Sequence, residues 1–214
     1  MTKLDLRKDL KTFYAPSAKT PVIVDIPRFQ FVMIDGQIEA GKSPGTSAGF
    51  EENMQALYGA AYTLKFMSKL RKENPIDVPV MALEGLWWVR DGHFDITIKD
   101  NWDYCVMILQ PDHITPEMFQ ETLAQLRRKK GDQPAFGRLR LESFQEGPCV
   151  QMMHIGPYAT EPATIDRMRL FAQENGYQDG VGLGGKHHEI YLGDPRRAAP
   201  EKLKTVLRHP VQEV

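Results

Sequence analysis

The alternation of apolar and polar residues predicts strands and helices in a repeated order. Residues 21–36 hold β-branched and aromatic runs bounded by proline and glycine, which predicts two extended segments. Between residues 50 and 72, apolar side chains recur at steps of three and four, which predicts a helix with one core-facing stripe. Two apolar runs, 79–89 and 102–109, lie on either side of an Asp91-Gly92 turn and predict strands. The first half therefore has the order β-α-β-β.

The second half resembles the first and follows a connector. Residues 116–130 predict a polar helix with a narrow apolar side. Beyond it the pattern predicts strands at 138–144, 149–155 and 187–192, a helix that ends near Gly176, and a terminal helix that begins at Pro200.

These elements predict an α+β fold made of tandem duplicated β-α-β-β units. The segments Phe31–Gly36 and Val150–Gly156 are similar, and each precedes a loop and a helix. Such self-similarity indicates a duplication, so we expect a single domain over residues 1–214 with repeats at about 21–110 and 138–211. Pseudo-twofold symmetry would place the helices on one sheet face and leave a ligand cleft at the seam.

Composition and charge exclude several classes of protein. The 214 residues include 27 Lys and Arg against 28 Asp and Glu, so the formal net charge is −1, which argues against nucleic acid as a partner. No run approaches the ~20 apolar residues of a membrane span, and the mixed-charge start lacks an export signal. We therefore expect a cytoplasmic protein without a membrane partner. Cys105 and Cys149 lie in apolar runs and are expected to be reduced core residues.

A phosphate-loop match in this sequence does not indicate nucleotide hydrolysis. The segment Gly36–Ser43 fits G-x-x-x-x-G-K-[ST] at every position. In a phosphate loop, however, the lysine and serine begin a helix, whereas here Pro44 and Gly45 follow them. The strand order also lacks the alternation that a parallel nucleotide-binding sheet requires.

The run His187-His188-Glu189 suggests a metal site only at first sight. Successive strand residues point to opposite faces, so His187 and Glu189 share one face while His188 takes the other. No further ligand, His154 included, lies at a convincing spacing, and we expect neither a metal nor another cofactor.

Glu189 and Tyr191 lie two residues apart and share a strand face. A carboxylate and a phenol in this arrangement can hold a cation or orient a water molecule. The alternative, left open by the residues themselves, is a solvent-exposed edge glutamate and a core tyrosine.

Aromatic side chains are concentrated in the first half. Trp87 and Trp88 are adjacent on a strand and must face opposite ways, and Trp88 shares its face with Glu84. Trp102 begins the next strand, and Tyr62 belongs to an aromatic row on the long helix. Aromatic rings with a carboxylate favour planar, hydrophobic and often cationic ligands. Ordinary core packing is the alternative.

Three segments, Met81–Trp88, Cys149–Tyr158 and His187–Arg196, resemble the GyrI-like small-molecule-binding family. More narrowly, they resemble its stand-alone subfamily, which includes cyclopropanoid cyclopropyl hydrolases. The resemblance implies a pocket at the junction of two repeats, lined by aromatic residues, with an acidic residue on the last strand at the position of Glu189. Multidrug-sensing relatives carry a DNA-binding domain. Only about 20 residues precede the first strand here, which is too few for a three-helix DNA-binding domain.

From the residues and the resemblance together we expect a xenobiotic-binding protein that opens the cyclopropane ring of DNA-alkylating compounds by adding water. Its expected partners are planar hydrophobic or cationic small molecules, and the alternative is a non-catalytic multidrug-binding or sequestering module. A DNA-gyrase inhibitor has no support beyond the family's name. The expected catalytic residues are Glu189 and Tyr191, and the expected ligand-binding residues are Trp88, Trp102, Tyr62, Tyr158 and Glu84.

Overall fold

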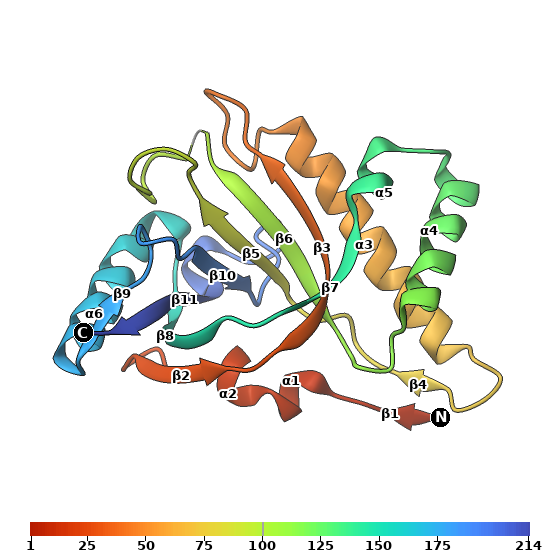
Figure 1. The fold of residues 1–214 in the computed structure, drawn as a ribbon, viewed down its shortest axis with the longest axis horizontal. Coiled ribbons are helices and arrows are strands. Elements are labelled where there is room, and N and C mark those ends of the chain that lie inside the picture. The colour runs from red at the N-terminus through yellow and green to blue at the C-terminus, as the bar shows by residue number, and fades with distance from the viewer. Residues whose placement is uncertain (100) are drawn as a thin grey trace.

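The computed structural model describes residues 1–99 and 101–214, in which strands and helices follow one another as Figure 1 shows. The helices are α1 (Leu6–Asp9), α2 (Lys11–Tyr14), α3 (Ala48–Lys69), α4 (Pro116–Lys130), α5 (Pro134–Arg138), α6 (Glu161–Glu174) and the 3₁₀ turns η1 (Tyr158–Thr160) and η2 (Pro200–Lys202). The strands are β1 (Thr2–Lys3), β2 (Val22–Ile26), β3 (Phe29–Gln37), β4 (Ile76–Asp77), β5 (Leu83–Trp88), β6 (Asp103–Gln110), β7 (Arg140–Phe144), β8 (Gly147–Ile155), β9 (Tyr177–Asp179), β10 (His187–Tyr191) and β11 (Lys204–Glu213).

One antiparallel sheet organises the molecule. Its strand order is β2-β8-β11-β10-β5-β6-β3-β7, with β9 paired to β11. The inner strands of the second half, β8-β11-β10, mirror those of the first half, β3-β6-β5, and β10 pairs with β5 where the halves meet. The tandem α+β architecture predicted from the sequence is therefore present, and its seam is the β5–β10 pair.

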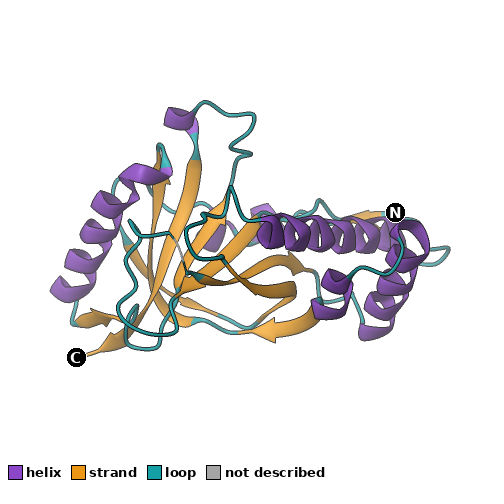
Figure 2. Ribbon diagram, turned by 90° about the horizontal axis from the view of Figure 1, so that it is seen from above, coloured by secondary structure: helices purple, strands orange, loops and turns teal. Residues whose placement is uncertain are grey.

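Helices α3 and α6 cover the same face of the sheet, one over each half (Figures 1 and 2). On α3, the Ser47 hydroxyl caps the first turn by accepting from the Phe50 amide, as a helix start requires. The Phe50 ring packs edge-on against Tyr104 of β6. On α6, Thr164 hydrogen bonds to His154 of β8 at 2.9 Å. Helix α4 spans the predicted connector and packs on α3.

The opposite face of the sheet is covered by the N-terminal segment. Tyr14 of α2 is buried, and its hydroxyl donates to Glu84 of β5 at 2.6 Å. Arg208 of β11 donates to the Phe13 carbonyl at 2.8 Å. The N-terminal segment, for which the sequence predicted no helix or strand, is thus anchored to the sheet by polar contacts.

The predicted terminal helix is wrong. Pro200 begins only the 3₁₀ turn η2, and the chain then continues as β11, between β8 and β10. Val206 and Leu207 are both fully buried because both faces of this inner strand are covered. A strand buried on both faces loses its alternation, so its apolar run can be mistaken for a helical stripe. Consequently Glu189 lies on the strand before the last.

Cys105 and Cys149 are buried and reduced, as expected. Burial raises the pKa of the Cys105 thiol to about 12, so this thiol is unreactive in the folded protein. Among the described residues, none of the helices combines the length and the apolar character that crossing a bilayer demands.

Candidate functional site

The candidate site lies on the helix-covered face of the β5–β10 seam. Because residues alternate along β10, His187, Glu189 and Tyr191 share this face. The register pairs His187 with Trp87 and Glu189 with Gly85. Glu189 is only 4% exposed, so its charge is held inside the protein rather than at an edge.

Aromatic side chains surround Glu189 on the first-half side. The Trp87 indole Nε1 donates to the Tyr191 hydroxyl at 3.1 Å, and its ring lies 5.4 Å from that of Trp102. A Cβ atom at Gly85 would lie 2.7 Å from Trp87 Nε1. The absence of a side chain at Gly85 therefore lets the Trp87 indole lie across the strand and reach Tyr191.

A lysine occupies the position expected for a cation in this aromatic group. The Lys99 ammonium lies 5.7 Å from the centroid of the Trp102 ring and 5.9 Å from that of Tyr158. Tyr158 in turn packs edge-on against Tyr191, with 6.1 Å between the ring centroids. The site thus offers aromatic faces and carboxylate charge that stabilise a positive group.

Glu161, at the start of α6, is a second carboxyl group in the site. It is completely buried, and neither of its oxygens has a hydrogen-bond partner among the described residues. Burial, together with the neighbouring charge of Glu189, raises the pKa of Glu161 to about 9, although Lys99 opposes the shift. At neutral pH this side chain is a carboxylic acid with a proton to give.

Glu189 has the opposite protonation state. Burial alone would raise its pKa, but the hydrogen bond and charge of His187, with the nearby Tyr191 hydroxyl and Lys99, lower it below the usual range. An ionised carboxylate and a neutral carboxylic acid therefore face the same space. This is the arrangement by which one site can supply a base and an acid at the same pH.

Glu161, His187 and Glu189 also meet the distance requirement for a metal site. One ligand atom from each lies within 4.8 Å of the others. His187, however, already uses both ring nitrogens, at 2.7 Å from His209 and 3.0 Å from Glu189. We therefore treat the group as a hydrogen-bonded cluster of acids and imidazoles.

A cavity of about 250 Å³ adjoins this cluster. It lies between the loop at 93–97 and the first turns of α6, and its walls include His187 and His209. It is large enough for several water molecules. The charged and polar groups Asp95, Asp166 and Arg169 also line it.

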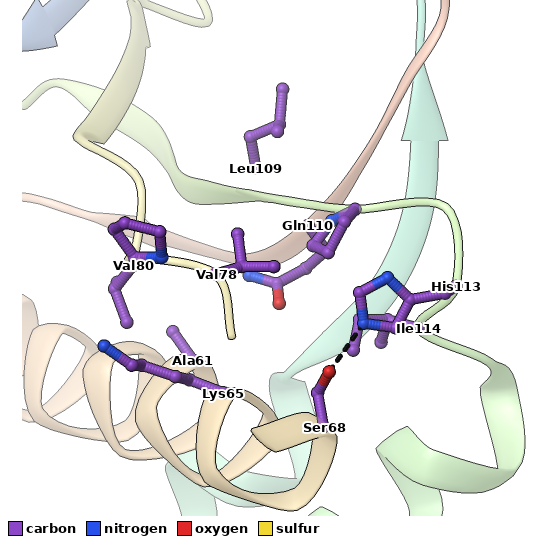
Figure 3. Close-up of a pocket in the computed structure, with 11 residues that line it drawn as sticks. Ala61, Lys65, Ser68, Val78, Val80, Leu109, Gln110, His113 and Ile114 are labelled. Carbon is purple, nitrogen blue, oxygen red and sulfur yellow. Dashed lines mark hydrogen bonds between the residues drawn. The ribbon is translucent and has the colours of Figure 1, made fainter. Parts of the chain in front are cut away.

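A second hollow, shown in Figure 3, does not make a catalytic site. Its volume is about 20 Å³, room for about one water molecule. Ser68 and His113 lie 2.7 Å apart there, like a nucleophile and its base. The Ser68 hydroxyl, however, donates to the Ile76 carbonyl at 2.9 Å, so its proton holds the end of α3 to β4.

The structure brings together four of the residues expected from the sequence. Tyr158 packs against Tyr191, the Lys99 ammonium lies near the rings of Trp102 and Tyr158, and Glu189 lies near Lys99 and Tyr191. Tyr62 does not join them, because its position on α3 leaves 49% of its side chain exposed and its ring packs near Tyr58.

Glu84 and Trp88 lie on the other face of the sheet. The expected shared face of these two residues is correct, but the register pairs Trp87, not Trp88, with His187. The Trp88 ring instead lies beneath the Lys186 ammonium at 3.6 Å. The choice between two adjacent tryptophans depended on which strand face meets the helices, and only the three-dimensional pairing decides that.

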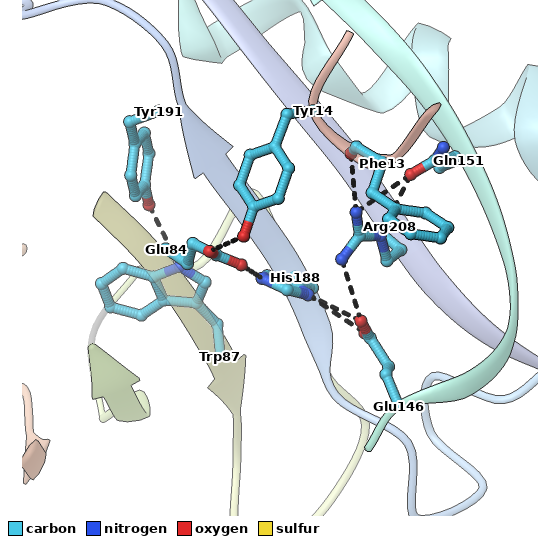
Figure 4. A network of polar contacts seen from close by, with 9 residues as sticks. All are labelled: Phe13, Tyr14, Glu84, Trp87, Glu146, Gln151, His188, Tyr191 and Arg208. Atoms are coloured by element: carbon cyan, nitrogen blue, oxygen red, sulfur yellow. Dashed lines mark hydrogen bonds and ion pairs between the residues drawn. The ribbon is translucent and has the colours of Figure 1, made fainter. Parts of the chain in front are cut away.

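Glu84 belongs to a buried charge network, shown in Figure 4. His188 lies between two carboxylates, 3.1 Å from Glu84 and 2.9 Å from Glu146. Arg208 donates to Glu146 at 3.3 Å. Burial opposes protonation of His188, but the two glutamates raise its pKa, so it is an imidazolium that neutralises them together with Arg208. The network fixes the N-terminal segment and lies on the opposite face of the sheet from Glu189.

Sequence reasoning missed several residues of the site, among them Trp87, Glu161 and His209, as well as Lys99 and His187. For the ligand-binding wall, Trp88 was expected instead of its neighbour Trp87. Glu161 lies in the first turn of a helix, where acidic residues are common because they interact favourably with the helix dipole. His209 lies in a segment expected to be helical. A carboxyl group at the start of a helix signals chemistry only when the structure shows it buried and unpartnered.

Comparisons with known proteins give a consistent family and fold. Residues 19–212 match the family model described as a GyrI-like small molecule binding domain. An uncharacterized conserved protein from Listeria innocua is 39% identical, with a TM-score of 0.88, and the match covers 98% of this chain and 100% of that one.

Two structures named as hydrolases from Listeria innocua are also similar. One is 38% identical, with a TM-score of 0.84 and coverage of 99% of this chain and 100% of that one. The other is 37% identical, with a TM-score of 0.82 and coverage of 98% and 100%. Among curated proteins, no match was found.

Proposed function

Because the chain belongs to the GyrI-like small-molecule-binding family, we propose that it binds planar hydrophobic or cationic xenobiotics beside Glu189 and hydrolyses cyclopropanoid alkylating compounds. The observation that carries the proposal is the pair of buried carboxyl groups, ionised Glu189 and neutral Glu161, next to aromatic walls. The two similar structures named as hydrolases support the catalytic part.

The aromatic groups supply the binding energy for a planar ligand. Trp87, Trp102 and Tyr158 present rings around the Glu189 carboxylate, and stacking on such rings is worth about 0.5–1.5 kcal/mol for each pair beyond area burial. The Lys99 ammonium already rests against two of them, which supports the view that a ligand cation is stable at the same place.

Ring opening needs a base for water and a donor for the carbonyl oxygen of the dienone. Glu189 takes a proton from water while the water oxygen bonds to the ring CH₂ carbon and the strained carbon–carbon bond breaks. The electron pair of that bond passes through the dienone to its oxygen, which becomes a phenolate and receives the proton of Glu161. One water molecule is added, and the two proton transfers cancel.

Further polar groups are in place to stabilise the developing phenolate. The Trp102 indole N–H is buried without an acceptor among the described residues, so it is able to donate to the ligand. Burial and the charge of Glu189 raise the pKa of Tyr191, so its hydroxyl stays protonated and donates to Glu189. Donors of this kind act more strongly in a water-excluded site than in solution.

The test is to incubate the protein with excess cyclopropanoid alkylator in heavy-oxygen water and to measure product by mass spectrometry. Catalysis predicts ring-opened product in molar excess over protein, with the heavy oxygen incorporated. Glu189→Gln preserves shape and removes the base, so we expect turnover to fall by at least about 100-fold without unfolding. Glu201→Gln, which removes an exposed carboxylate, serves as the control.

Two outcomes would contradict the proposal. Stoichiometric capture of the compound without turnover would leave only the alternative function, a binding or sequestering module. Global unfolding of Glu189→Gln would mean that the carboxylate is a structural group.

A further inference from the structure

A chain of four polar groups, three of them buried, leads from Glu189 across β10 and β11 to Asp179 of β9. His187 Nε2 lies 3.0 Å from Glu189, His187 Nδ1 lies 2.7 Å from His209 Nε2, and His209 Nδ1 lies 2.9 Å from Asp179. The groups come from β10, β11 and β9, so the strand pairing aligns them. His187 and His209 are almost completely buried.

The chain holds one more proton than two neutral imidazoles supply. Each of its three hydrogen bonds requires one proton, so the chain needs three. Two neutral imidazoles bring one each, and two ionised carboxylates bring none. One additional proton must therefore reside in the chain, and this gives the four groups a net charge of −1 rather than −2.

The ionised state of Asp179 determines where the additional proton lies. Burial alone would raise the pKa of Asp179, but the hydrogen bond and charge of His209, together with Arg169, lower it to about 2. An ionised Asp179 makes His209 Nδ1 the donor, and because burial lowers the pKa of His209, its Nε2 carries no proton. His187 Nδ1 must then donate to His209, which places the additional proton between His187 Nε2 and Glu189.

The chain reaches water at its Asp179 end. Both imidazoles line the cavity of about 250 Å³ beneath the loop at 93–97. All four ring nitrogens are engaged within the chain, however, so a proton can leave it only at Asp179. The Asp179 side chain is 13% exposed.

We propose that Asp179, His209 and His187 form a proton relay that serves Glu189 in the hydrolysis proposed above, on which this inference rests. When Glu189 takes a proton from the attacking water, one proton enters the relay at Glu189 and one leaves it to water at Asp179. Glu161, which gave its proton to the phenolate oxygen, regains one from water after product release. Protons balance over the cycle, and no oxidant or reductant is needed.

Charged groups on every neighbouring element set the direction of transfer. From α6, Arg169 donates to Asp179 at 2.8 Å, and neutral Glu161 faces Glu189. From the loop before β6, Lys99 favours the ionised form of Glu189, while His93 and Asp95 line the cavity. On η1 and β10 the phenols Tyr158 and Tyr191 stay protonated, since burial and Glu189 raise the pKa of each.

The proton content can be measured on the resting protein, with no substrate, from nitrogen-15 histidine NMR spectra. The relay predicts that His209 is protonated at Nδ1 only. It also predicts that His187 carries a proton at Nδ1, with a second, shared proton at Nε2. A His209 protonated at Nε2 alone, or a His187 without an Nδ1 proton, would overturn the relay.

Asp179→Asn tests whether the relay acts in turnover. The variant keeps the shape of the side chain and removes the charge that fixes His209, so we expect kcat to fall by at least about tenfold at unchanged KM, with a shifted pH profile. Asp9→Asn makes the same change at an exposed aspartate outside the cavity lining and is the matched control. A folded Asp179→Asn with the wild-type pH profile and kcat would make the chain purely structural.

The two proposals fail in different ways. Absence of turnover by the wild-type protein overturns the hydrolase proposal, and the relay's role in catalysis with it, whatever the NMR spectra show. Normal wild-type turnover with the wrong histidine tautomers overturns the relay alone.

Discussion

At the scale of single residues, the buried polar groups divide into those with partners and those without. His188 lies between two carboxylates and is satisfied on both nitrogens. Glu161 is equally buried, yet both of its oxygens lack a partner among the described residues. An unpartnered buried carboxyl group destabilises the fold, so its presence indicates a function that depends on it.

The contribution of Glu161 to the free energy of unfolding depends on pH. Its pKa is about 9 in the folded protein against 4.5 as the ordinary value, so the folded state binds the proton more tightly. The stability contributed by this proton is fully present below about pH 4.5 and is lost as the pH rises through about 9.

Glu161→Gln should therefore stabilise the protein at alkaline pH. Because glutamine does not titrate, the gain over wild type should be small at pH 4, grow by up to about 1.4 kcal/mol for each pH unit, and level off above about pH 9. Urea unfolding of both proteins at a series of pH values measures it. The proposed acid role predicts that turnover falls in the same variant. A difference in stability that does not change with pH would mean that Glu161 is ionised in the fold.

At the scale of elements, β10 serves two separate tasks through its alternation. His187, Glu189 and Tyr191 face the candidate site, while His188 faces the charge network that holds the N-terminal segment. A shift of one residue in register would exchange the two sets. The pairing of β10 with β5 and β11 on its two sides fixes that register.

Gly85 of β5 gives a test of this arrangement. A methyl group there would collide with the Trp87 indole, so Gly85→Ala should displace the ring, break its hydrogen bond to Tyr191 and weaken binding of a planar cationic dye by about tenfold or more. Dye titration and tryptophan fluorescence measure the effect. In Gly45→Ala the added methyl group has no neighbour within 4 Å, so this variant should bind like the wild type. Equal affinities would place the ligand away from Trp87.

At the scale of the whole molecule, one sheet separates two charged interiors. One face holds the acid–imidazole cluster under α6, and the other holds Glu84, His188, Glu146 and Arg208 under the N-terminal segment. Both lie at or beside the seam between the halves, where β5 and β10 meet. The repeat boundaries at about 21–110 and 138–211 stay a prediction.

The titrating groups on both faces predict a stability maximum in mildly acidic to neutral solution. Burial opposes ionisation of Glu146, but His188 and Arg208 lower its pKa to about 2, and Asp179 is lowered similarly. Their stabilisation is present above about pH 4.5 and is lost as the pH falls towards about 2. The raised pKa of His188 acts in the opposite sense, since its contribution is present below about pH 6.5 and is lost as the pH rises through the folded-state value.

Thermal unfolding measured from pH 2 to pH 10 checks this expectation. The melting temperature should decline on both sides of the maximum, and the alkaline decline should be shallower in Glu161→Gln. A melting temperature that stayed constant from mildly acidic to alkaline pH would contradict the assigned protonation of His188 and Glu161.

The sequence by itself determined the elements whose signals are local. The stripe of α3, the connector α4 and the strand pairs of each half are visible as periodicity, because a helix or strand with one buried face repeats its apolar residues at a fixed step. The segments around Trp88, Tyr158 and Glu189 also carried the resemblance to the GyrI-like family, which the family model matches.

The tertiary structure decided which of these residues meet. The choice of Trp87 over Trp88, the placement of Glu161 beside Glu189 and the alignment of His187 with His209 all depend on strand pairing and on the position of α6. The strand β11 was hidden from pattern analysis because side chains on both of its faces are buried once α6 and the N-terminal segment cover the sheet. Periodicity records whether a residue is buried, but which distant residue buries it is set only when the chain folds.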